Sequence, residues 1–306
     1  MDAGEELRGL DNNHLYALHA LLVERTVTGA AARLERTQPT LSAALARLRR
    51  LFGDELLTRV GNHYRLTPFA EQLLPLVSVA VAAVERVFAA RSQFDPAGSD
   101  RVFTVVSSDY GISVAGARLV ALLSERAPGT AVRFRPVTPE TLNRPPEFAR
   151  TVDGVFMPRG YLDLPRTRDL YRDRWVCITS ADNPAIGSEL TMADLSRLPW
   201  VSTFDDPLGR GSAWRQMELL GVVPRVCATA DSFLAMPYLV RNTGGIAMMQ
   251  HRVAKSVAAA LGIRTLELPF DAVPLVEAFW WHPIHDTDAG HAWFRAVLGE
   301  VAAQLN

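Results

Sequence analysis

The sequence predicts an α/β protein in which a small winged helix-turn-helix domain is followed by a long linker helix and a larger α/β domain. Three observations predict this class. Apolar residues recur at helical spacing in the first third of the chain, another apolar helical pattern follows Thr67-Pro68, and short β-branched runs alternate with helical segments from Arg101 onward. With 306 residues, the chain is long enough for two or three compact units.

Composition indicates a globular chain without a membrane span. Hydrophobic residues make up 48% and charged residues 21%, and no run of eighteen or more apolar residues occurs. The first ten residues contain three acids and lack the pattern of a secretory signal, so we expect a cytoplasmic protein. Cys177 and Cys227 lie in apolar strand-like runs without CxxC spacing, and we expect two reduced core thiols.

Basic charge is concentrated in one segment. The net charge of −1 argues against a generic nucleic-acid coat protein. Residues 33–67 nevertheless carry seven arginines against three acids, which predicts a surface that faces phosphates.

Three helices are predicted at the start of the chain. The first covers Leu15–Val23, and Thr28 is expected to cap a short second helix. Thr37 is expected to cap a longer third helix over residues 39–52, with Pro39 in its first turn. A short helix, a tight turn and a longer helix with polar residues in its first turns form the geometry that enters the major groove of DNA.

The outer face of the third helix is the predicted recognition surface. The apolar residues Leu41, Leu45, Leu48 and Phe52 should face inward. This leaves Gln38, Ser42 and Arg49 on the opposite face. The Gln38 amide suits an adenine edge, and the hydroxyls of the helix suit bases or phosphates. A solvated helix face is the alternative, which the basic excess disfavours.

A two-stranded wing is predicted after this helix. Residues 55–60 and 63–66 read as short strands joined at Gly61-Asn62, with arginines placed for the DNA backbone or a narrow minor groove. Surface arginines without a partner are the alternative. The candidate DNA-binding residues are Thr28, Thr37, Gln38, Pro39, Thr40, Ser42, Arg47, Arg49, Arg59 and Arg65.

These elements together resemble the DNA-binding module of LysR-type transcriptional regulators. The resemblance rests on Thr28-Gly29-Ala30-Ala31, Thr37-Gln38-Pro39-Thr40-Leu41-Ser42, Phe52-Gly53-Asp54-Glu55-Leu56-Leu57 and Leu66-Thr67-Pro68, and covers most of residues 10–90. Ala43 stands where the family often has an arginine. The run Ser42–Arg49 resembles the branch with nodulation-gene activators and regulators of aromatic-compound degradation.

A linker helix from Pro68 is predicted to pair with a second copy of the chain. Apolar residues alternate four- and three-residue steps along it, which is the pattern of a dimer seam. A helix packed on its own domain is the alternative, and Pro75 should bend the helix locally. The seam residues are Leu73, Val77, Ala80, Val84 and Val87. The resemblance implies the same pairing, commonly extended to a tetramer.

The larger domain is predicted to hold a small molecule between two parallel-sheet units. Strands that end in Ser, Thr and Asp just before helices place polar groups and backbone amides at one crevice, where an anionic group is favoured. Ordinary helix capping is the alternative for each of them. The candidate effector-binding residues are Ser107, Ser108, Asp109, Tyr110, Ser202, Thr203, Phe204, Ser232 and Phe233.

The resemblance adds a fold for this domain. LysR-type sensor domains have the fold of periplasmic binding proteins, which implies two crossing strands, here near residues 170–175 and 269–277. The expected organisation is a DNA-binding domain over 10–67, a linker helix over 68–92 and an effector domain over 100–306. Within the latter, subdomain I covers about 100–172 and 275–306, and subdomain II about 173–272. The broken pattern over residues 139–153 departs from the family.

No motif supports catalysis, and we expect no cofactor. The chain has no Walker loop, GxGxxG after a strand or GxSxG elbow. His282, His285 and His291 match no common zinc spacing, so no metal is expected. We therefore expect a DNA-binding regulator controlled by a small molecule, aromatic or carboxylate-bearing, acting as a homodimer or homotetramer on double-stranded DNA. Two alternative functions are considered. One is a cytoplasmic small-molecule-binding protein or enzyme with a protein-interaction N-terminal domain, and the other is a solute-binding transport protein.

Overall fold

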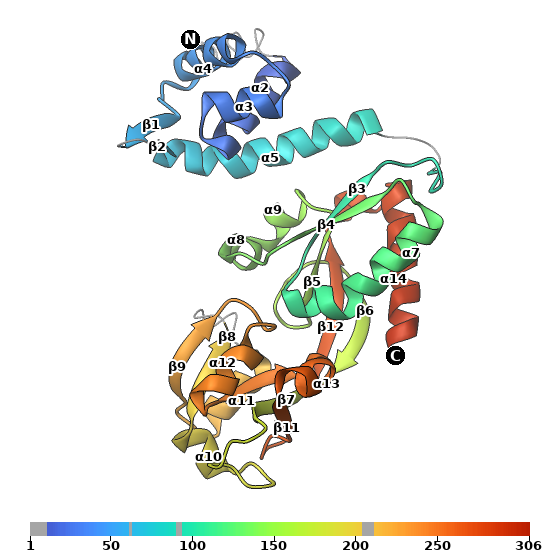
Figure 1. Ribbon diagram of the computed structural model, residues 1–306. Helices are drawn as coiled ribbons and strands as arrows, with labels where there is room; N and C mark the ends of the chain where they lie inside the picture. Colours follow the sequence, from blue (N-terminus) through green and yellow to red (C-terminus); the bar gives the residue numbers. More distant parts are fainter. Residues whose placement is uncertain (1–10, 61–62, 90–93, 204–210) are drawn as a thin grey trace. The chain divides into compact units, whose positions relative to one another are not determined.

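The computed structural model describes residues 11–60, 63–89, 94–203 and 211–306. The chain divides into two compact units, residues 1–91 and 92–306. Figure 1 shows the first unit as helices with one hairpin and the second as two sheets flanked by helices. The predicted α/β class is confirmed.

The first unit is built on three short helices and one long one. They are α2 (Asn12–Glu24), α3 (Val27–Arg33), α4 (Gln38–Phe52) and α5 (Pro68–Ala89). The helices α2, α3 and α4 bury one apolar face each in a common core of leucines and alanines. Each leucine side chain fully removed from water contributes about 1.5–3 kcal/mol, so this core holds the helices together. Its fully buried members include Leu21, Leu22, Ala30, Leu41 and Leu48.

The helix starts agree with the sequence prediction except at α3. The cap of α3 is Thr26, whose hydroxyl accepts a hydrogen bond from the Gly29 amide at 3.0 Å. The predicted cap at Thr28 is therefore wrong, and Thr28 lies exposed within the first turn of the helix. At α4, Thr37 is the cap residue without a side-chain cap bond, and Gly53 ends the helix with a φ of 61°.

The wing follows α4 as an antiparallel hairpin of β1 (Leu57–Val60) and β2 (His63–Leu66). Its base is fixed by the Asp54 carboxylate, which accepts from the Leu56 amide and the Thr67 hydroxyl, both at 2.6 Å. The Thr67 hydroxyl in turn accepts from the Ala70 amide at 3.1 Å and so caps α5.

The long helix α5 packs partly on its own unit. Val77 and Val81 are buried in the core with α2, and Leu73 packs against it. The predicted seam is thus wrong at Val77 and Leu73, because the alternative of packing on the own domain holds for this half of the helix. By length and composition alone, Pro68–Glu85 is also apolar enough to cross a membrane, with a mean hydropathy of 1.3.

The second unit consists of two five-stranded sheets, each with its own core-facing helices. The first sheet has the order β4-β3-β5-β12-β6 and the second β11-β7-β10-β8-β9. The first-sheet strands are β3 (Val102–Val106), β4 (Ala131–Arg135), β5 (Gly154–Pro158), β6 (Arg166–Asp173) and β12 (Leu275–Trp281). The second-sheet strands are β7 (Trp175–Ser180), β8 (Pro199–Thr203), β9 (Arg225–Ala230), β10 (Ile246–Gln250) and β11 (Ile263–Leu266).

Both sheets are mixed rather than parallel as predicted. In the first, β12 pairs antiparallel with β5 and β6, and in the second β7 pairs antiparallel with β10 and β11. The reason is that the chain crosses from the first sheet to the second at Arg174, and returns over residues 267–274. The strand that follows each crossing, β7 after the first and β12 after the second, runs antiparallel to both of its neighbours. We call the first sheet with its helices lobe I and the second lobe II.

Helices cover both lobes. Lobe I carries α6 (Asp109–Gly111), a π-helical turn (Ile112–Gly116), α7 (Ala117–Arg126), α8 (Pro139–Asn143), α9 (Pro145–Ala149), a 3-10 turn (Pro283–His285) and α14 (Ala289–Leu305). Lobe II carries α10 (Met192–Arg197), α11 (Ser212–Leu219), α12 (Met236–Thr243) and α13 (His251–Leu261). The sequence pattern predicts a helix from Ser232 to Arg241, but α12 begins at Met236, because Phe233–Ala235 form a turn before it.

The two cysteines differ in environment. Cys177 is fully buried on β7, and burial raises the pKa of its thiol to about 12. Cys227 is exposed, because it lies on β9 at the edge of its sheet, where one face of the strand is uncovered. The prediction of two core thiols is therefore wrong for Cys227.

Candidate nucleic-acid interface and effector site

The first turns of α4 present polar side chains to solvent. Gln38, Thr40 and Ser42 are all exposed, whereas Leu41 and Leu45 are buried below them. The hydroxyl oxygens of Thr37 and Thr40 lie 2.8 Å apart, so a local hydrogen bond orders the start of the helix. The turn before the helix passes through Glu35, whose φ is 52°.

Not every arginine of this surface points outward. Arg49 Nε donates to the Glu55 carbonyl at 2.8 Å, and Nη2 donates to the Leu57 carbonyl at 3.0 Å. The guanidinium also forms an ion pair with the Glu55 carboxylate at 3.1 Å. These contacts join the last turns of α4 to β1, whereas Arg47 is exposed. Arg49 therefore orients the wing, and its predicted contact with DNA stays a prediction.

The two wing arginines lie on opposite faces of the hairpin. Arg59 pairs in register with Tyr64, and Arg65 pairs with Thr58. Residues that face each other across an antiparallel pair share a face, and neighbours along a strand alternate. Arg59 and Arg65 are both exposed, so the wing presents cationic side chains in two directions.

Asp109 connects the two lobes of the second unit. It follows β3 of lobe I, and its carboxylate accepts from the Ser232 hydroxyl at 2.7 Å, the Phe233 amide at 3.1 Å and the Leu234 amide at 3.0 Å in lobe II. The neighbouring Tyr110 ring meets the Phe233 ring edge-on at 6.1 Å between centroids. The structure thus brings together four predicted effector residues, Asp109, Tyr110, Ser232 and Phe233. The amides that were predicted to favour an anionic ligand donate instead to the Asp109 carboxylate of the protein.

The predicted serines divide between capping and the space between the lobes. The Ser108 hydroxyl accepts from the Gly111 amide at 3.4 Å and caps α6, which is the alternative left open for it. Ser232 does both, because its hydroxyl also accepts from the Ala235 amide at 3.0 Å. Ser107 is buried, and its hydroxyl donates to the Ser108 carbonyl at 2.9 Å.

Ser202 and Thr203 lie apart from the Asp109 contact. They are buried at the end of β8 and line a small cavity of about 10 Å³ within lobe II, together with Trp175, Gly211 and Trp214. Phe204, the remaining predicted effector residue, falls outside the described residues. The cavity shows that β8 ends beside the first crossing strand.

Two acids near the crossings were missed by the sequence analysis. Glu277 on β12 is fully buried, and burial raises the pKa of its carboxyl to about 8, with the Asp173 carboxylate adding to the shift. Asp173 accepts a hydrogen bond from the Tyr110 hydroxyl at 3.0 Å. A Cβ placed on Gly111 would lie 2.4 Å from Ser107 Oγ and 3.6 Å from Glu277 Oε1, so glycine at this position leaves room for both side chains. The sequence signal that could have identified Glu277 is an acidic residue inside the otherwise apolar strand Leu275–Trp281.

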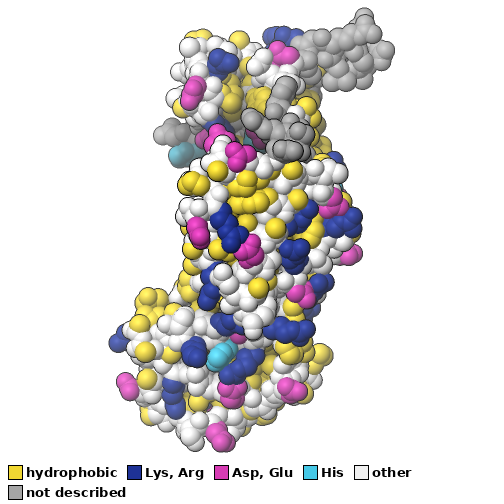
Figure 2. All heavy atoms as spheres, turned by 90° about the vertical axis from the view of Figure 1, so that its right-hand side faces the viewer, with side chains coloured by type: hydrophobic (Ala, Val, Ile, Leu, Met, Phe, Trp, Pro, Cys, Tyr) yellow, Lys and Arg dark blue, Asp and Glu magenta, His cyan; other side chains and the backbone are white. Residues whose placement is uncertain are grey.

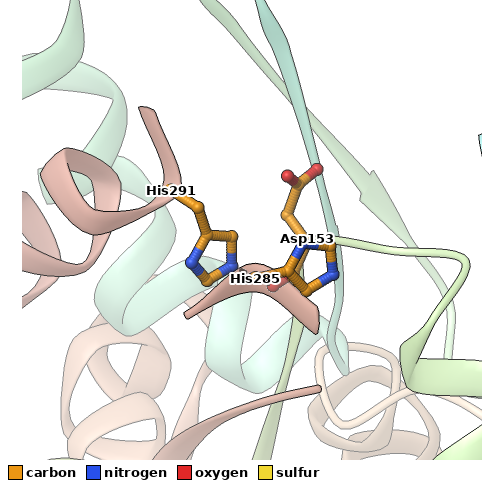
Figure 3. Close-up of side chains that lie close together, drawn as sticks. All are labelled: Asp153, His285 and His291. Carbon is orange, nitrogen blue, oxygen red and sulfur yellow. Dashed lines mark hydrogen bonds between the residues drawn. The ribbon is translucent and has the colours of Figure 1, made fainter. Parts of the chain in front are cut away.

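Three side chains of lobe I come close enough to suggest a metal site. One potential ligand atom from each of Asp153, His285 and His291 lies within 4.8 Å of the others (Figure 3). The two imidazole rings stack with centroids 4.7 Å apart. His291 Nε2 contacts the Asp153 carbonyl at 2.6 Å, and His285 Nε2 contacts the Val152 carbonyl at 3.0 Å.

Hydrogen bonds explain this cluster. Arg295 donates to His291 Nδ1 at 2.6 Å, so Nε2 carries the proton and donates to the Asp153 carbonyl. The Asp153 carboxylate accepts from Arg101 at 2.9 Å and from the Thr104 amide at 2.7 Å. A metal ion would have to displace these partners, so the arrangement fits a buried polar network better than a ligand set.

An exposed recognition-type helix with a wing, followed by two lobes whose polar side chains meet between them, defines the class of DNA-binding regulators that respond to a ligand. Residues 12–71 match the bacterial regulatory helix-turn-helix protein of the lysR family, and residues 96–303 match the LysR substrate binding domain. The chain belongs to the LysR family of transcriptional regulators, and it is a regulator rather than an enzyme.

Relatives agree over nearly the full length. Nodulation protein D 2 of Rhizobium tropici is 31% identical over 303 residues, which are 97% of this chain and 95% of the relative. Nodulation protein D 1 of Rhizobium meliloti is also 31% identical, over 98% of this chain and 97% of the relative. The predicted resemblance to the nodulation branch is confirmed.

Solved structures agree in fold. The crystal structure of a probable transcriptional regulator from Pseudomonas aeruginosa has a TM-score of 0.72 and 26% identity, covering 97% of this chain and 98% of that one. CbnR, a LysR family transcriptional regulator, has a TM-score of 0.64 and 16% identity, covering 96% of this chain and 99% of that one.

Proposed function

We propose that this regulator reads operator DNA with the exposed start of α4 and contacts the DNA backbone with the wing. The observation that carries the proposal is the exposure of Gln38, Thr40 and Ser42 on the first turns of a helix whose other face is buried. Gln38 would read a base edge. Arg47, Arg59 and Arg65 would supply phosphate contacts. Such a protein works in the cytoplasm, where its DNA lies.

The proposed effector site lies where lobes I and II meet, at Ser107, Asp109, Tyr110 and Phe233. Ser202 and Thr203 lie apart from this contact, in the small cavity of lobe II. The Asp109 carboxylate already accepts hydrogen bonds from the Phe233 and Leu234 amides at this site. Glu277 is a second acid close to Ser107. A carboxylate on the effector would lie beside the Asp109 carboxylate and be repelled by it. Of the two predicted effector classes, the aromatic one is therefore favoured, with hydroxyl groups that a protonated Glu277 can hydrogen-bond.

Pairing of two copies through α5 is part of the proposal. Leu76 is 67% and Val87 71% exposed, and Ala80 and Ala83 between them complete alternating steps of four and three residues. This stripe is next to the face that Val77 and Val81 bury. A second helix on the stripe gives a homodimer, and the same apolar surface explains why α5 has the composition of a membrane-spanning helix.

Footprinting on the DNA upstream of its own gene tests the central proposal. The wild-type chain should protect a discrete site more weakly at high salt, because phosphate contacts release counterions. Gln38→Ala should lose the site, whereas Gln72→Ala, an exposed glutamine on α5, should keep it. Added aromatic compounds that differ only in a hydroxyl or a carboxylate then test the effector class. Absence of any protected site would favour a small-molecule-binding protein instead.

A further inference from the structure

A second groove lies on the second unit beside the first crossing, at Arg174. It has a volume of about 670 Å³, within the range of small-molecule sites. Its walls come from the start of α7, from the end of β6 with the first crossing, and from the start of α13 (Figure 1). We call it the hinge groove, defined by Arg118, Arg172, Arg174, His251, Arg252 and Lys255.

The hinge groove carries an excess of positive charge. Its lining includes four arginines and one lysine but a single carboxylate, Asp173. That carboxylate is buried and accepts hydrogen bonds from the Tyr110 hydroxyl at 3.0 Å and the Arg174 amide at 2.8 Å. The Asp173 carboxylate is therefore already hydrogen-bonded within the protein, and five cationic side chains line the same groove.

Few of these cations have an acidic partner. Among the described residues, no salt bridge involves Arg118, Arg172 or Lys255, and all three are exposed. Arg174 pairs with Glu267, whose side chain is 75% exposed. Figure 2 shows Lys and Arg side chains gathered on this side of the second unit. Like charges held together raise the local potential and attract anions.

The recognising groups would be side chains rather than the start of a helix. The first amides of α13 are already used, because His251 donates to the Arg174 carbonyl at 2.9 Å and Arg252 donates to the Asp173 carboxylate at 3.3 Å. The Arg252 guanidinium is held on the wall by the carbonyls of Arg172 at 3.2 Å and Leu305 at 2.8 Å. Exposed Arg118 and Lys255 flank this fixed cation from the two lobes.

We propose that the hinge groove binds a small, multiply charged anion of the phosphate or polycarboxylate type, separate from the effector site. Guanidinium groups bind such oxyanions in a fork, and a lysine adds a point charge. Because Arg118 and Arg172 belong to lobe I and Arg252 and Lys255 to lobe II, the bound anion stabilises one arrangement of the lobes about their crossings.

Calorimetric titration at fixed ionic strength tests this proposal, with pyrophosphate and citrate as separate probes. The full chain should bind at least one of them with saturation at one site per chain, and the stronger probe tells phosphate from polycarboxylate. The double variant Arg118→Gln, Lys255→Gln should weaken binding tenfold or more. The control Arg133→Gln, Arg135→Gln removes two exposed arginines of β4 and should change binding less than twofold. No saturable binding, or equal loss in the control, would overturn the proposal.

The chain offers an independent readout, because Lys255 is its only lysine. Pyridoxal 5′-phosphate is an aldehyde with a phosphate group, which condenses with the Lys255 amine with loss of water. Borohydride then reduces the imine, and peptide mapping separates Lys255 from the terminal amine. Labelling of Lys255 should be fast and should be slowed by the better anion probe. Labelling that this probe leaves unchanged, or that only duplex DNA slows, would contradict a small-anion site.

Discussion

His291 illustrates how a buried side chain in this protein is kept neutral. Its imidazole is fully buried between Phe279, Phe294 and the ring of His285, and burial lowers its pKa from 6.5 to about 3. The hydrogen bond to the Asp153 carbonyl does not compensate for the lost hydration of the charged form. His291 is therefore part of the buried interior of lobe I.

The pKa of His291 predicts loss of stability in acid. The unfolded chain binds a proton near pH 6.5, whereas the folded chain does not until about pH 3, so protonation favours unfolding as the pH falls through this window. The free energy of unfolding of the second unit should fall by roughly 1.4 kcal/mol per pH unit below 6.5 from this group.

Urea unfolding at pH 7.5 and 5.5 measures this effect. All six tryptophans lie between residues 175 and 293, so tryptophan fluorescence reports on the second unit alone. His291→Gln stays neutral at both pH values and should reduce the difference between them by about 1 kcal/mol or more. An identical pH dependence in the wild type and the variant would show that His291 is protonated in the fold.

At the scale of elements, Arg47 and Arg49 of α4 differ in their relation to the wing. Arg47 is exposed on α4, whereas Arg49 is bonded to the carbonyls of Glu55 and Leu57. Loss of a phosphate contact reduces the number of counterions released on binding, and loss of an orienting contact does not.

These two arginines therefore predict different salt dependences. Arg47→Gln should lower the slope of log affinity against log salt by about 0.9, whereas Arg49→Gln should weaken DNA binding at every salt concentration with the slope unchanged. Fluorescence anisotropy with operator DNA at several salt concentrations measures both. A reduced slope for Arg49→Gln would mean that its guanidinium leaves the wing and reaches the DNA.

Much of this arrangement could be predicted from sequence, because helical periodicity and turn residues are local signals. The recognition helix, the wing, the long helix and most strands of both lobes agree with expectation. Long-range packing decided the rest. Val77 carries the same apolar signal whether it meets α2 or a second copy, and Asp109 looks like an anion-site neighbour until Ser232 is placed beside it. The amphipathic α13 was missed although Val253 and Ala254 mark its buried face.

The exposed stripe of α5 predicts self-association. Leu76→Glu puts a charge into the proposed helix pair and should shift the full chain toward monomers at micromolar concentration, because a buried unpaired charge is costly. Glu71→Gln changes the charge at an exposed position on another face of the helix and should leave the assembly unchanged. Sedimentation velocity distinguishes the two. A monomeric wild type, or a Leu76→Glu chain that assembles fully, would show that α5 does not pair.

At the scale of the whole second unit, the Asp109 contact sets how firmly the lobes are held together. Its carboxylate is the acceptor for two amides and one hydroxyl of lobe II, while the chain between the lobes consists of only two crossings. An effector shifts the arrangement of the lobes only if it binds one arrangement more tightly. The strength of this contact is therefore part of the equilibrium on which any effector acts.

Removing the Asp109 charge should loosen the two lobes without unfolding them. Asp109→Asn keeps the size but puts an amide nitrogen where an acceptor is needed, and hydrogen bonds to a charged group contribute about 1.5–3 kcal/mol. Hydrogen exchange at the Phe233 and Leu234 amides should therefore speed up by about 10- to 100-fold. Ser108→Ala removes a cap within lobe I and should leave both amides protected. If Asp109→Asn leaves their exchange unchanged, other contacts between the lobes protect these amides and Asp109 does not hold the lobes together.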